Sequence, residues 1–337
     1  MMLPIDVPSL HPVPEPTLPS GSLPFFVALV GPTGTGKSAI AVEVAKAVGG
    51  EIVALDSMQV YRRLDIGTAK PTPAERGEIP HHLIDLVEPD GPFTAVDYAR
   101  SAHHVITGIH ARGRLPLVVG GSGLYLRALR GEIFPGPREV KSIRARLGRE
   151  ADQGGPHVLH ARLARLDPLA AGRIHPRDRF RLVRALEIIE VTGRRVTDLW
   201  KAHRQGLAQQ PPALMLGVYR ARTDLYRRIN DRVDRMLTSG LLREVKTLLD
   251  AGYAPNVKPF GSHNYRHIVA FLLGQAGLEE ASRRTKQETR HYAKRQMTWF
   301  RRETGIQWVD LNHTDGGTAT EILVQHIQTA RERYGSA

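Results

Sequence analysis

The chain has 337 residues, of which 41% are hydrophobic and 24% are charged, and it contains no cysteine. This length and composition suit a soluble protein with one large domain or two smaller ones. The lack of cysteine excludes disulfides, thiolate zinc sites and cysteine nucleophiles, and it is compatible with a reducing compartment. Residues 1–24 are rich in Pro and Leu without the pattern of a signal peptide, and no later stretch has the length of a membrane span. We therefore expect a cytoplasmic protein without membrane association, with a disordered extension over residues 1–24.

The net charge of +13 is unevenly distributed along the chain. Residues 1–137 contain 11 Lys and Arg against 13 Asp and Glu, whereas residues 138–205 contain 16 against 8 and residues 206–337 contain 20 against 13. The whole basic excess therefore follows residue 137. A solvated, Arg-rich surface is one explanation, and phosphate contacts to a nucleic acid are the other.

Apolar runs alternate with helical patterns along most of the chain, which predicts an α/β fold with a parallel sheet covered by helices on both faces. The strands are expected at residues 25–30, 51–55, 115–119 and 213–218. The helices are expected at residues 38–48, 94–110, 225–238, 241–251, 266–273 and 278–302.

Between residues 138 and 204 no strand pattern is found, and apolar positions recur at helical spacing with Arg between them. We expect an all-helical insertion there. The domain organisation predicted from the sequence comprises a catalytic core over residues 25–137 and 205–315, the insertion over residues 138–204, and a C-terminal helix or tail over residues 316–337.

A P-loop motif of the form G-x-x-x-x-G-K-[ST] follows the first predicted strand and precedes the first predicted helix. Its residues are Gly31, Pro32, Thr33, Gly34, Thr35, Gly36, Lys37 and Ser38. The glycines let backbone N–H groups surround phosphate oxygens, Lys37 adds a positive charge, and the Ser38 hydroxyl is a candidate ligand for Mg²⁺. The motif therefore predicts a polyphosphate substrate and leaves the chemistry open.

Asp56 ends the second predicted strand, where open parallel sheets place their ligands. The third strand ends in Gly120-Gly121-Ser122-Gly123 without an acid, unlike the usual arrangement in P-loop NTPases. A Mg²⁺ ligand, a general base and a helix cap are all open roles for Asp56.

Six sequence blocks, which occur in one order and span most of the chain, resemble the tRNA dimethylallyltransferases, also called tRNA isopentenyltransferases. The blocks are Gly31–Ser38, Asp56–Tyr61, Asp65–Pro71, His81–Asp85, Gly120–Tyr125 and Lys294–Arg301. The resemblance implies a P-loop NTPase-like fold with a helical insertion that binds tRNA. It also implies transfer of a dimethylallyl group from its diphosphate to N6 of the adenine 3′ of the anticodon, in tRNAs that read U-initial codons.

The resemblance further assigns roles to individual residues. Asp56 becomes the general base, the P-loop holds the leaving diphosphate, and Ser38 binds a Mg²⁺ cofactor. Arg222 and Arg228 match a diphosphate-binding pair, Arg232 is a weaker candidate one turn further on, and Ser122 joins the catalytic group. The residues assigned to tRNA are Asp56, Ser57, Met58, Gln59, Ser122, Arg144, Phe180, Arg181, Leu182, Val183, Arg184, Lys294, Arg295, Thr298 and Arg301.

Several details of these assignments depend on local structure. The spacing of Arg177, Arg181 and Arg184 predicts three guanidinium groups on one helical face, available either to phosphates or to solvent. Trp299 and Phe300 can stack on bases or belong to the core. The pairs His81-His82 and His103-His104 do not suggest a metal site, because adjacent side chains point in different directions.

The chain also departs from the family pattern. Ser122 stands where Thr is usual, and in the segment Phe260–Arg266 the place of an RNA-contacting arginine is taken by Gly261. The alternatives to a monomeric tRNA dimethylallyltransferase are a small-molecule P-loop kinase, an RNA-dependent NTPase or RNA-binding module, and an enzyme that prenylates free adenine nucleotides. The basic excess and the later sequence blocks favour tRNA as the acceptor.

Overall fold

The computed structural model describes residues 23–206, 213–312 and 314–334. These residues form two compact units, one over residues 131–206 and the other over residues 23–130 together with those after 212. All but the last two residues of the predicted N-terminal extension lie outside the described part of the chain. No helix in the described part is long and apolar enough to cross a membrane.

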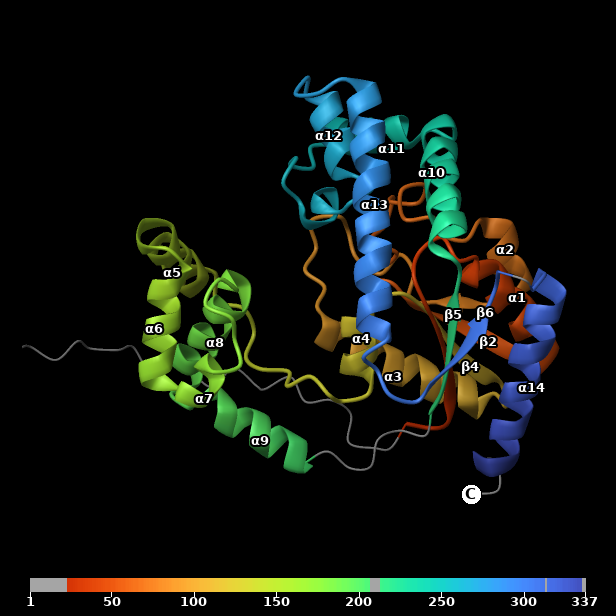
Figure 1. Ribbon diagram of the computed structural model, residues 1–337, viewed down its shortest axis with the longest axis horizontal. Helices are drawn as coiled ribbons and strands as arrows, with labels where there is room; N and C mark the ends of the chain where they lie inside the picture. The colour runs from red at the N-terminus through yellow and green to blue at the C-terminus, as the bar shows by residue number, and fades with distance from the viewer. Residues whose placement is uncertain (1–22, 207–212, 313, 335–337) are drawn as a thin grey trace, which may run out of the picture. The chain divides into compact units, whose positions relative to one another are not determined.

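The larger unit is built on one six-stranded sheet in which every strand pair is parallel (Figure 1). The strands are β1 (Phe26–Val30), β2 (Gly50–Leu55), β3 (His81–His82), β4 (Leu115–Gly120), β5 (Ala213–Tyr219) and β6 (Ile306–Asp310). Their order in the sheet is β3-β2-β4-β1-β5-β6, so the strand that leads into the P-loop is central. The carboxyl ends of β1, β2 and β4 therefore meet at one edge, where ligands of open α/β sheets bind.

The two faces of the sheet are covered by different helices because side chains alternate along each strand. In β1, Val27 and Leu29 pack with α1 (Lys37–Val48) and α14 (Gly316–Tyr334), whereas Phe26, Ala28 and Val30 belong to the opposite core. The helices α3 (Ala95–Ala111) and α4 (Gly123–Leu129) bury their apolar side chains in that second core. The short helix α2 (Pro73–Glu78) follows a capping box formed by Thr72 and Glu75.

Four further helices and one 3₁₀ turn follow β5. They are α10 (Arg222–Thr238), α11 (Leu241–Asp250), η1 (Lys258–Gly261), α12 (Arg266–Leu272) and α13 (Leu278–Phe300). The long helix α13 packs against α10, α12 and α4, so it connects this helical group to the edge of the sheet that carries the P-loop (Figure 1).

The smaller unit is entirely helical within residues 131–206. Its helices are α5 (Lys141–Gly154), α6 (Pro156–Leu166), α7 (Pro168–Ala171), α8 (Arg179–Thr192) and α9 (Val196–Gly206). They enclose their own apolar core, which includes Leu147, Leu163 and Leu186. The unit also buries Glu187, whose carboxylate accepts hydrogen bonds from Val140 N–H at 2.8 Å and from two arginines.

The predicted strands are confirmed to within two residues at their ends, as are the helices predicted in the larger unit except α10, which begins at Arg222, three residues before the predicted start. Two strands escaped prediction for physical reasons. β3 has only two residues, and β6 is an edge strand with one fully buried side chain, Val309, so neither has the continuous apolar run of a central strand. The prediction that Arg177 shares a helical face with Arg181 and Arg184 is wrong, because Asp178 caps the helix and α8 begins at Arg179.

Candidate active site

The P-loop turns sharply between β1 and α1 at positions that require glycine. The φ angles of Gly31, Gly34 and Gly36 are 149°, 87° and 97°, in the region that L side chains rarely adopt. A Cβ on Gly31 would also collide with the carbonyl oxygen of Val218 in β5. The loop leads directly into the N-terminus of α1, so its N–H groups and the helix dipole favour a bound phosphate.

Three arginines donate hydrogen bonds to the P-loop. Arg220 Nε donates to the carbonyl of Thr35 at 2.9 Å, and Arg228 Nε donates to that of Gly34 at 3.0 Å. Arg232 donates to Thr33 Oγ1 at 3.2 Å. Because Arg228 and Arg232 are one turn apart on α10, both lie along the same side of the loop. The loop is therefore held in place by cations that also raise the local positive potential.

Lys37 is buried at the base of the loop, where its ammonium donates to the carbonyl of Pro32 at 2.8 Å. Burial lowers the pKa of Lys37 to about 7, and the charge of Arg232 acts in the same direction while Asp56 opposes it. A bound phosphate would restore the protonated form, because an adjacent negative charge raises the pKa of an amine.

Asp56 follows β2 and lies half-buried beside the P-loop. One carboxylate oxygen accepts a hydrogen bond from Met58 N–H at 2.7 Å. Burial raises the pKa of Asp56, although N–H groups of Met58 and Gln59 and the charges of Arg232 and Lys37 act against that shift. Asp56 is not a helix cap, since the chain turns after it and the next helix begins only at Pro73.

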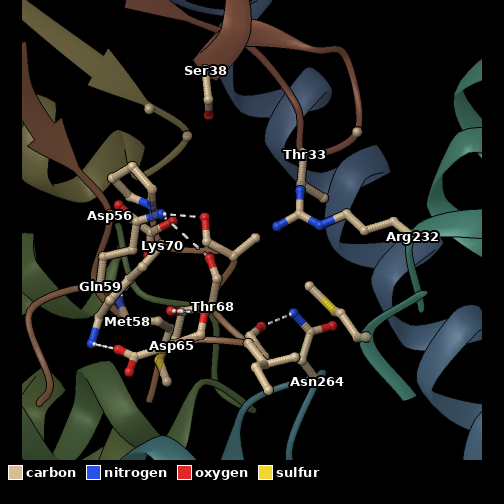
Figure 2. Close-up of a pocket in the computed structure, with 18 of the residues that line it drawn as sticks. Thr33, Ser38, Asp56, Met58, Gln59, Asp65, Thr68, Lys70, Arg232 and Asn264 are labelled. Atoms are coloured by element: carbon tan, nitrogen blue, oxygen red, sulfur yellow. Dashed lines mark hydrogen bonds and ion pairs between the residues drawn. The ribbon is translucent and has the colours of Figure 1, made fainter. Parts of the chain in front are cut away.

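A cavity of about 1300 Å³ joins these groups within the larger unit. Its lining includes Lys37 and Ser38 of the P-loop, Asp56, and Arg228 and Arg232 of α10. Figure 2 shows Asp56 and Arg232 on opposite sides of this cavity, with Ser38 near the top of the view. The cavity thus combines a cationic phosphate cradle with the half-buried carboxylate of Asp56.

The block Asp65–Pro71 forms part of the cavity wall and is held by two charged side chains, the half-buried Glu244 and the buried Lys70. Glu244 of α11 accepts hydrogen bonds from the N–H groups of Asp65 at 2.7 Å and Ile66 at 2.6 Å, and it also accepts from Gly67 and from the hydroxyl of Tyr265. The ammonium of Lys70 donates to Asp65 at 2.8 Å (Figure 2). This block therefore forms a fixed part of the cavity wall, because Glu244 and Lys70 hold it in place.

The blocks Gly120–Tyr125 and Lys294–Arg301 contact each other at a second wall. The Gln296 amide of α13 donates to the carbonyl of Gly121 at 2.9 Å and accepts from Thr33 N–H at 2.9 Å. A Cβ on Gly121 would collide with Gln296, and a Cβ on Gly123 would collide with the ring of Trp299. The glycines of this turn are therefore needed for the close approach of α13.

The other residues of the larger unit that the sequence predicts for the site differ in whether they line the cavity. Gln59, Met58 and Arg228 line the cavity, but Ser122 and Arg222 do not. Ser122 precedes the first turn of α4, and the guanidinium of Arg222 lies 5.1 Å from the centre of the Tyr226 ring. The predicted residues Lys294, Arg295 and Thr298 on α13 and Arg301 directly after it are exposed, whereas Phe300 is fully buried and Trp299 is partly buried.

Within the helical unit, the residues predicted to contact RNA differ in their exposure. Phe180 is 76% exposed and Arg181 is exposed beside Asp178. Leu182 is buried in the core of the unit, so its side chain is not available to RNA, and Val183 packs partly against that core. Arg144 and Arg184 both form ion pairs with the buried Glu187, which gives them a structural role in the unit.

The donor set of the cavity fits a magnesium ion that takes most of its ligands from phosphate and water. Ser38 and Asp56 contribute a hydroxyl and a carboxylate to the lining. No group of three or more His, Asp or Glu side chains suitable for a metal is found in the described part of the chain. Mg²⁺ commonly binds in this way, through few protein ligands and the oxygens of a phosphorylated substrate.

The fold and the cavity define a P-loop α/β protein with a cationic phosphate-binding loop beside a half-buried carboxylate. The family model described as IPP transferase matches residues 59–303, which is more than half of the chain. The chain therefore belongs to the IPP transferase family.

Individual relatives agree with this assignment. The chain is 49% identical to the tRNA dimethylallyltransferase of Geobacter sulfurreducens over 86% of its own length and 93% of that protein. It is similar to the solved tRNA isopentenylpyrophosphate transferase of Bacillus halodurans with a TM-score of 0.69 and 38% identity, over 93% of this chain and 98% of that one. A eukaryotic dimethylallyltransferase solved while acting on tRNA gives a TM-score of 0.74 at 29% identity, over 86% of this chain and 74% of that one. These relationships support the prenyltransferase prediction and not the kinase or NTPase alternatives.

Some residues that build the site have no clear signal in the sequence. Arg220 and Glu244 act through backbone contacts, which no local motif predicts. Gln296 lies within one of the recognised blocks, but its contact with Thr33 depends on how α13 packs. Arg232, taken from the sequence as a weaker candidate, lines the cavity and contacts the P-loop directly.

Proposed function

We propose that the protein transfers the dimethylallyl group from dimethylallyl diphosphate to N6 of the adenine 3′-adjacent to the anticodon, in tRNAs that read U-initial codons. The observation that carries this proposal is the half-buried carboxylate of Asp56, with its raised pKa, in the same cavity as a cationic phosphate cradle. The names of the relatives, which are tRNA dimethylallyltransferases, support tRNA as the acceptor.

The donor binds through its diphosphate. The P-loop N–H groups, Lys37 and Arg228 surround the diphosphate oxygens, and their positive charge stabilises the negative charge that grows as the group leaves. When bound at Ser38, Mg²⁺ supplies further neutralisation of the leaving group. The diphosphate is held as a leaving group, and no phosphoryl group is transferred.

In the reaction, the bond between the allylic carbon and the diphosphate oxygen breaks, and a bond between that carbon and N6 forms. The diphosphate leaves with the bonding electrons, and the carboxylate of Asp56 accepts the proton lost from N6. This help is needed because the lone pair of an exocyclic adenine amine is delocalised into the ring. The raised pKa of Asp56 makes its carboxylate a stronger base for that step.

The tRNA has to present an unstacked adenine to this cavity. The exposed side chains of Lys294 and Arg295 on α13 and of Arg301 directly after it provide phosphate contacts in the larger unit. In the helical unit, Phe180 and Arg181 are exposed for the same partner. The tRNA-binding role of the helical unit, the monomeric state and the cytoplasmic location remain predictions.

One assay tests the proposed function against its alternatives. The protein is incubated with Mg²⁺, labelled dimethylallyl diphosphate and either unmodified tRNA that reads U-initial codons or AMP. We expect the label to enter tRNA at the adenine next to the anticodon. Label found only in AMP would identify an enzyme for free nucleotides, and phosphate transfer from ATP without prenylation would identify a kinase; either outcome rejects the proposal.

A further inference from the structure

His263 lines the active-site cavity and has no assigned role. Its imidazole stacks on the ring of Tyr292 in α13, with ring centres 4.4 Å apart and planes inclined by 25°. No hydrogen bond of either ring nitrogen is found within the described residues. The ring is therefore held by stacking, and both nitrogens are available to a ligand in the cavity.

The backbone that carries His263 is fixed by the two residues that follow it. The side-chain amide of Asn264 donates to the carbonyl of Gly67 at 2.6 Å, and its oxygen accepts from Thr289 Oγ1 at 3.1 Å. The hydroxyl of Tyr265 donates to Glu244 at 2.6 Å. Figure 2 shows Asn264 at the end of the cavity away from Ser38. This anchoring holds the imidazole in one orientation, and a residue that recognises a ligand requires such a fixed orientation.

The charge state of His263 limits what it can bind. Burial lowers its pKa to about 4, and the charges of Arg232, Arg295 and Arg266 act in the same direction. The neutral ring offers one N–H donor and one nitrogen acceptor. The neutral ring therefore adds no positive charge to attract a diphosphate, and Lys37 already supplies such a charge. A dimethylallyl group has no polar atom with which the ring could form a hydrogen bond.

The polar edge of a neutral nucleobase matches this donor and acceptor. We propose that His263 is a specificity-determining residue that hydrogen-bonds the acceptor base, with the His263–Tyr292 stack fixing its orientation. This inference rests on the proposed function, because it names the contact that positions the acceptor for Asp56. His263 lies in the segment Phe260–Arg266, in which this sequence departs from the family pattern.

The test measures base recognition separately from catalysis. Binding of two anticodon stem-loop RNAs is compared, one with adenine at the target position and one with an abasic site there. His263→Phe keeps a ring to stack on Tyr292 but removes both nitrogens, whereas His263→Gln keeps one donor and one acceptor. His291→Phe is the matched control, since His291 is exposed on α13 and does not line the cavity.

We expect the wild-type protein to prefer the adenine RNA, and His263→Phe to lose about 10- to 100-fold of that preference with unchanged binding of the abasic RNA. His263→Gln is expected to stay within about threefold of the wild type, as is His291→Phe. The KM for dimethylallyl diphosphate is expected not to change in any of them. Should His263→Phe fail to fold, His263→Leu replaces it, because it also removes both nitrogens.

Three results would overturn the inference: a wild-type protein without a preference for adenine, a His263→Phe variant that keeps the preference, or one that weakens both RNAs equally. Failure of the proposed function is distinguished by the transfer assay. A wild-type protein that prefers the adenine RNA through His263 but transfers no prenyl group would reject the proposed reaction and retain the base contact.

Discussion

Gln296 of α13 connects Thr33 of the P-loop to the turn after β4. It accepts a hydrogen bond from Thr33 N–H at 2.9 Å and donates another to the carbonyl of Gly121 at the same distance. A P-loop binds phosphate through N–H groups whose orientation has to be set beforehand. The helix that carries the last of the six sequence blocks therefore also helps to fix the P-loop at Thr33.

Gln296→Ala is expected to weaken the phosphate site. Loss of the two hydrogen bonds frees the loop at Thr33, and we expect kcat/KM for dimethylallyl diphosphate to fall by about 30-fold, since two bonds of roughly 1 kcal/mol each amount to about 2 kcal/mol. Steady-state kinetics with varied donor measures this effect. Gln287→Ala, at an exposed position of the same helix, serves as the control. Equal kinetics in the two variants would show that the bridge does not matter for phosphate binding.

Asp56→Asn tests the general base. The amide cannot accept the N6 proton, so kcat is expected to fall by about 10²- to 10⁴-fold while binding of the donor is largely retained. Since burial raises the pKa of Asp56, the wild-type rate is expected to decline on acidification from a pH above the ordinary pKa of 3.8, as the carboxylate becomes protonated. Asp90→Asn, at an exposed site, is the control. A variant that regains activity at high Mg²⁺ would instead identify Asp56 as a metal ligand.

Lys37 is expected to take up a proton when inorganic diphosphate binds. Its pKa of about 7 leaves the free side chain mostly neutral at pH 8, and the bound anion raises that pKa, so binding at pH 8 adds up to about one proton. At pH 6 the side chain is already protonated and this uptake disappears. Calorimetry in buffers of different ionisation enthalpy measures the proton count. Lys37→Arg is the control, because arginine stays charged at both pH values; the same uptake in this variant would assign the proton to another group.

Glu244→Ala is expected to destabilise the loop that follows Leu64. The carboxylate accepts from three consecutive N–H groups and from Tyr265, and its removal leaves these donors without their partner. We expect the free energy of unfolding to fall by about 1–3 kcal/mol. Urea denaturation measures the change, with Glu321→Ala at an exposed position of α14 as the control. A variant as stable as this control would mean that water replaces the carboxylate.

The sequence predicts those parts of the molecule that depend on local chemistry. The P-loop is recognised because phosphate binding requires glycines, Lys37 and Ser38 at fixed spacing, and the central strands because burial on both faces gives continuous apolar runs. Asp56 is found because it ends one of these strands.

The remaining contacts of the site depend on how the helices and strands pack together, which no local sequence pattern predicts. Arg144 and Arg184 appear in the sequence as cations available to RNA, yet both pair with the buried Glu187. Conversely, Arg220 has no motif of its own, and its contact with Thr35 arises because β5 lies next to β1. Whether an arginine supports the fold or meets a ligand is decided by the neighbours that the fold brings to it.

Gly123→Ala is expected to disturb both stability and the phosphate site. Its Cβ would collide with the ring of Trp299, so α13 has to shift, and such overpacking costs about 1–3 kcal/mol of the free energy of unfolding. The same shift moves Gln296, which lies about one turn from Trp299 on α13, so binding of diphosphate should weaken as well. Gly77→Ala in α2 is the control, because no atom lies within 4 Å of its Cβ position and alanine there should stabilise by up to about 1 kcal/mol. Urea denaturation and calorimetric titration with diphosphate measure the two effects, and loss of stability without loss of binding would separate the Trp299 contact from the P-loop.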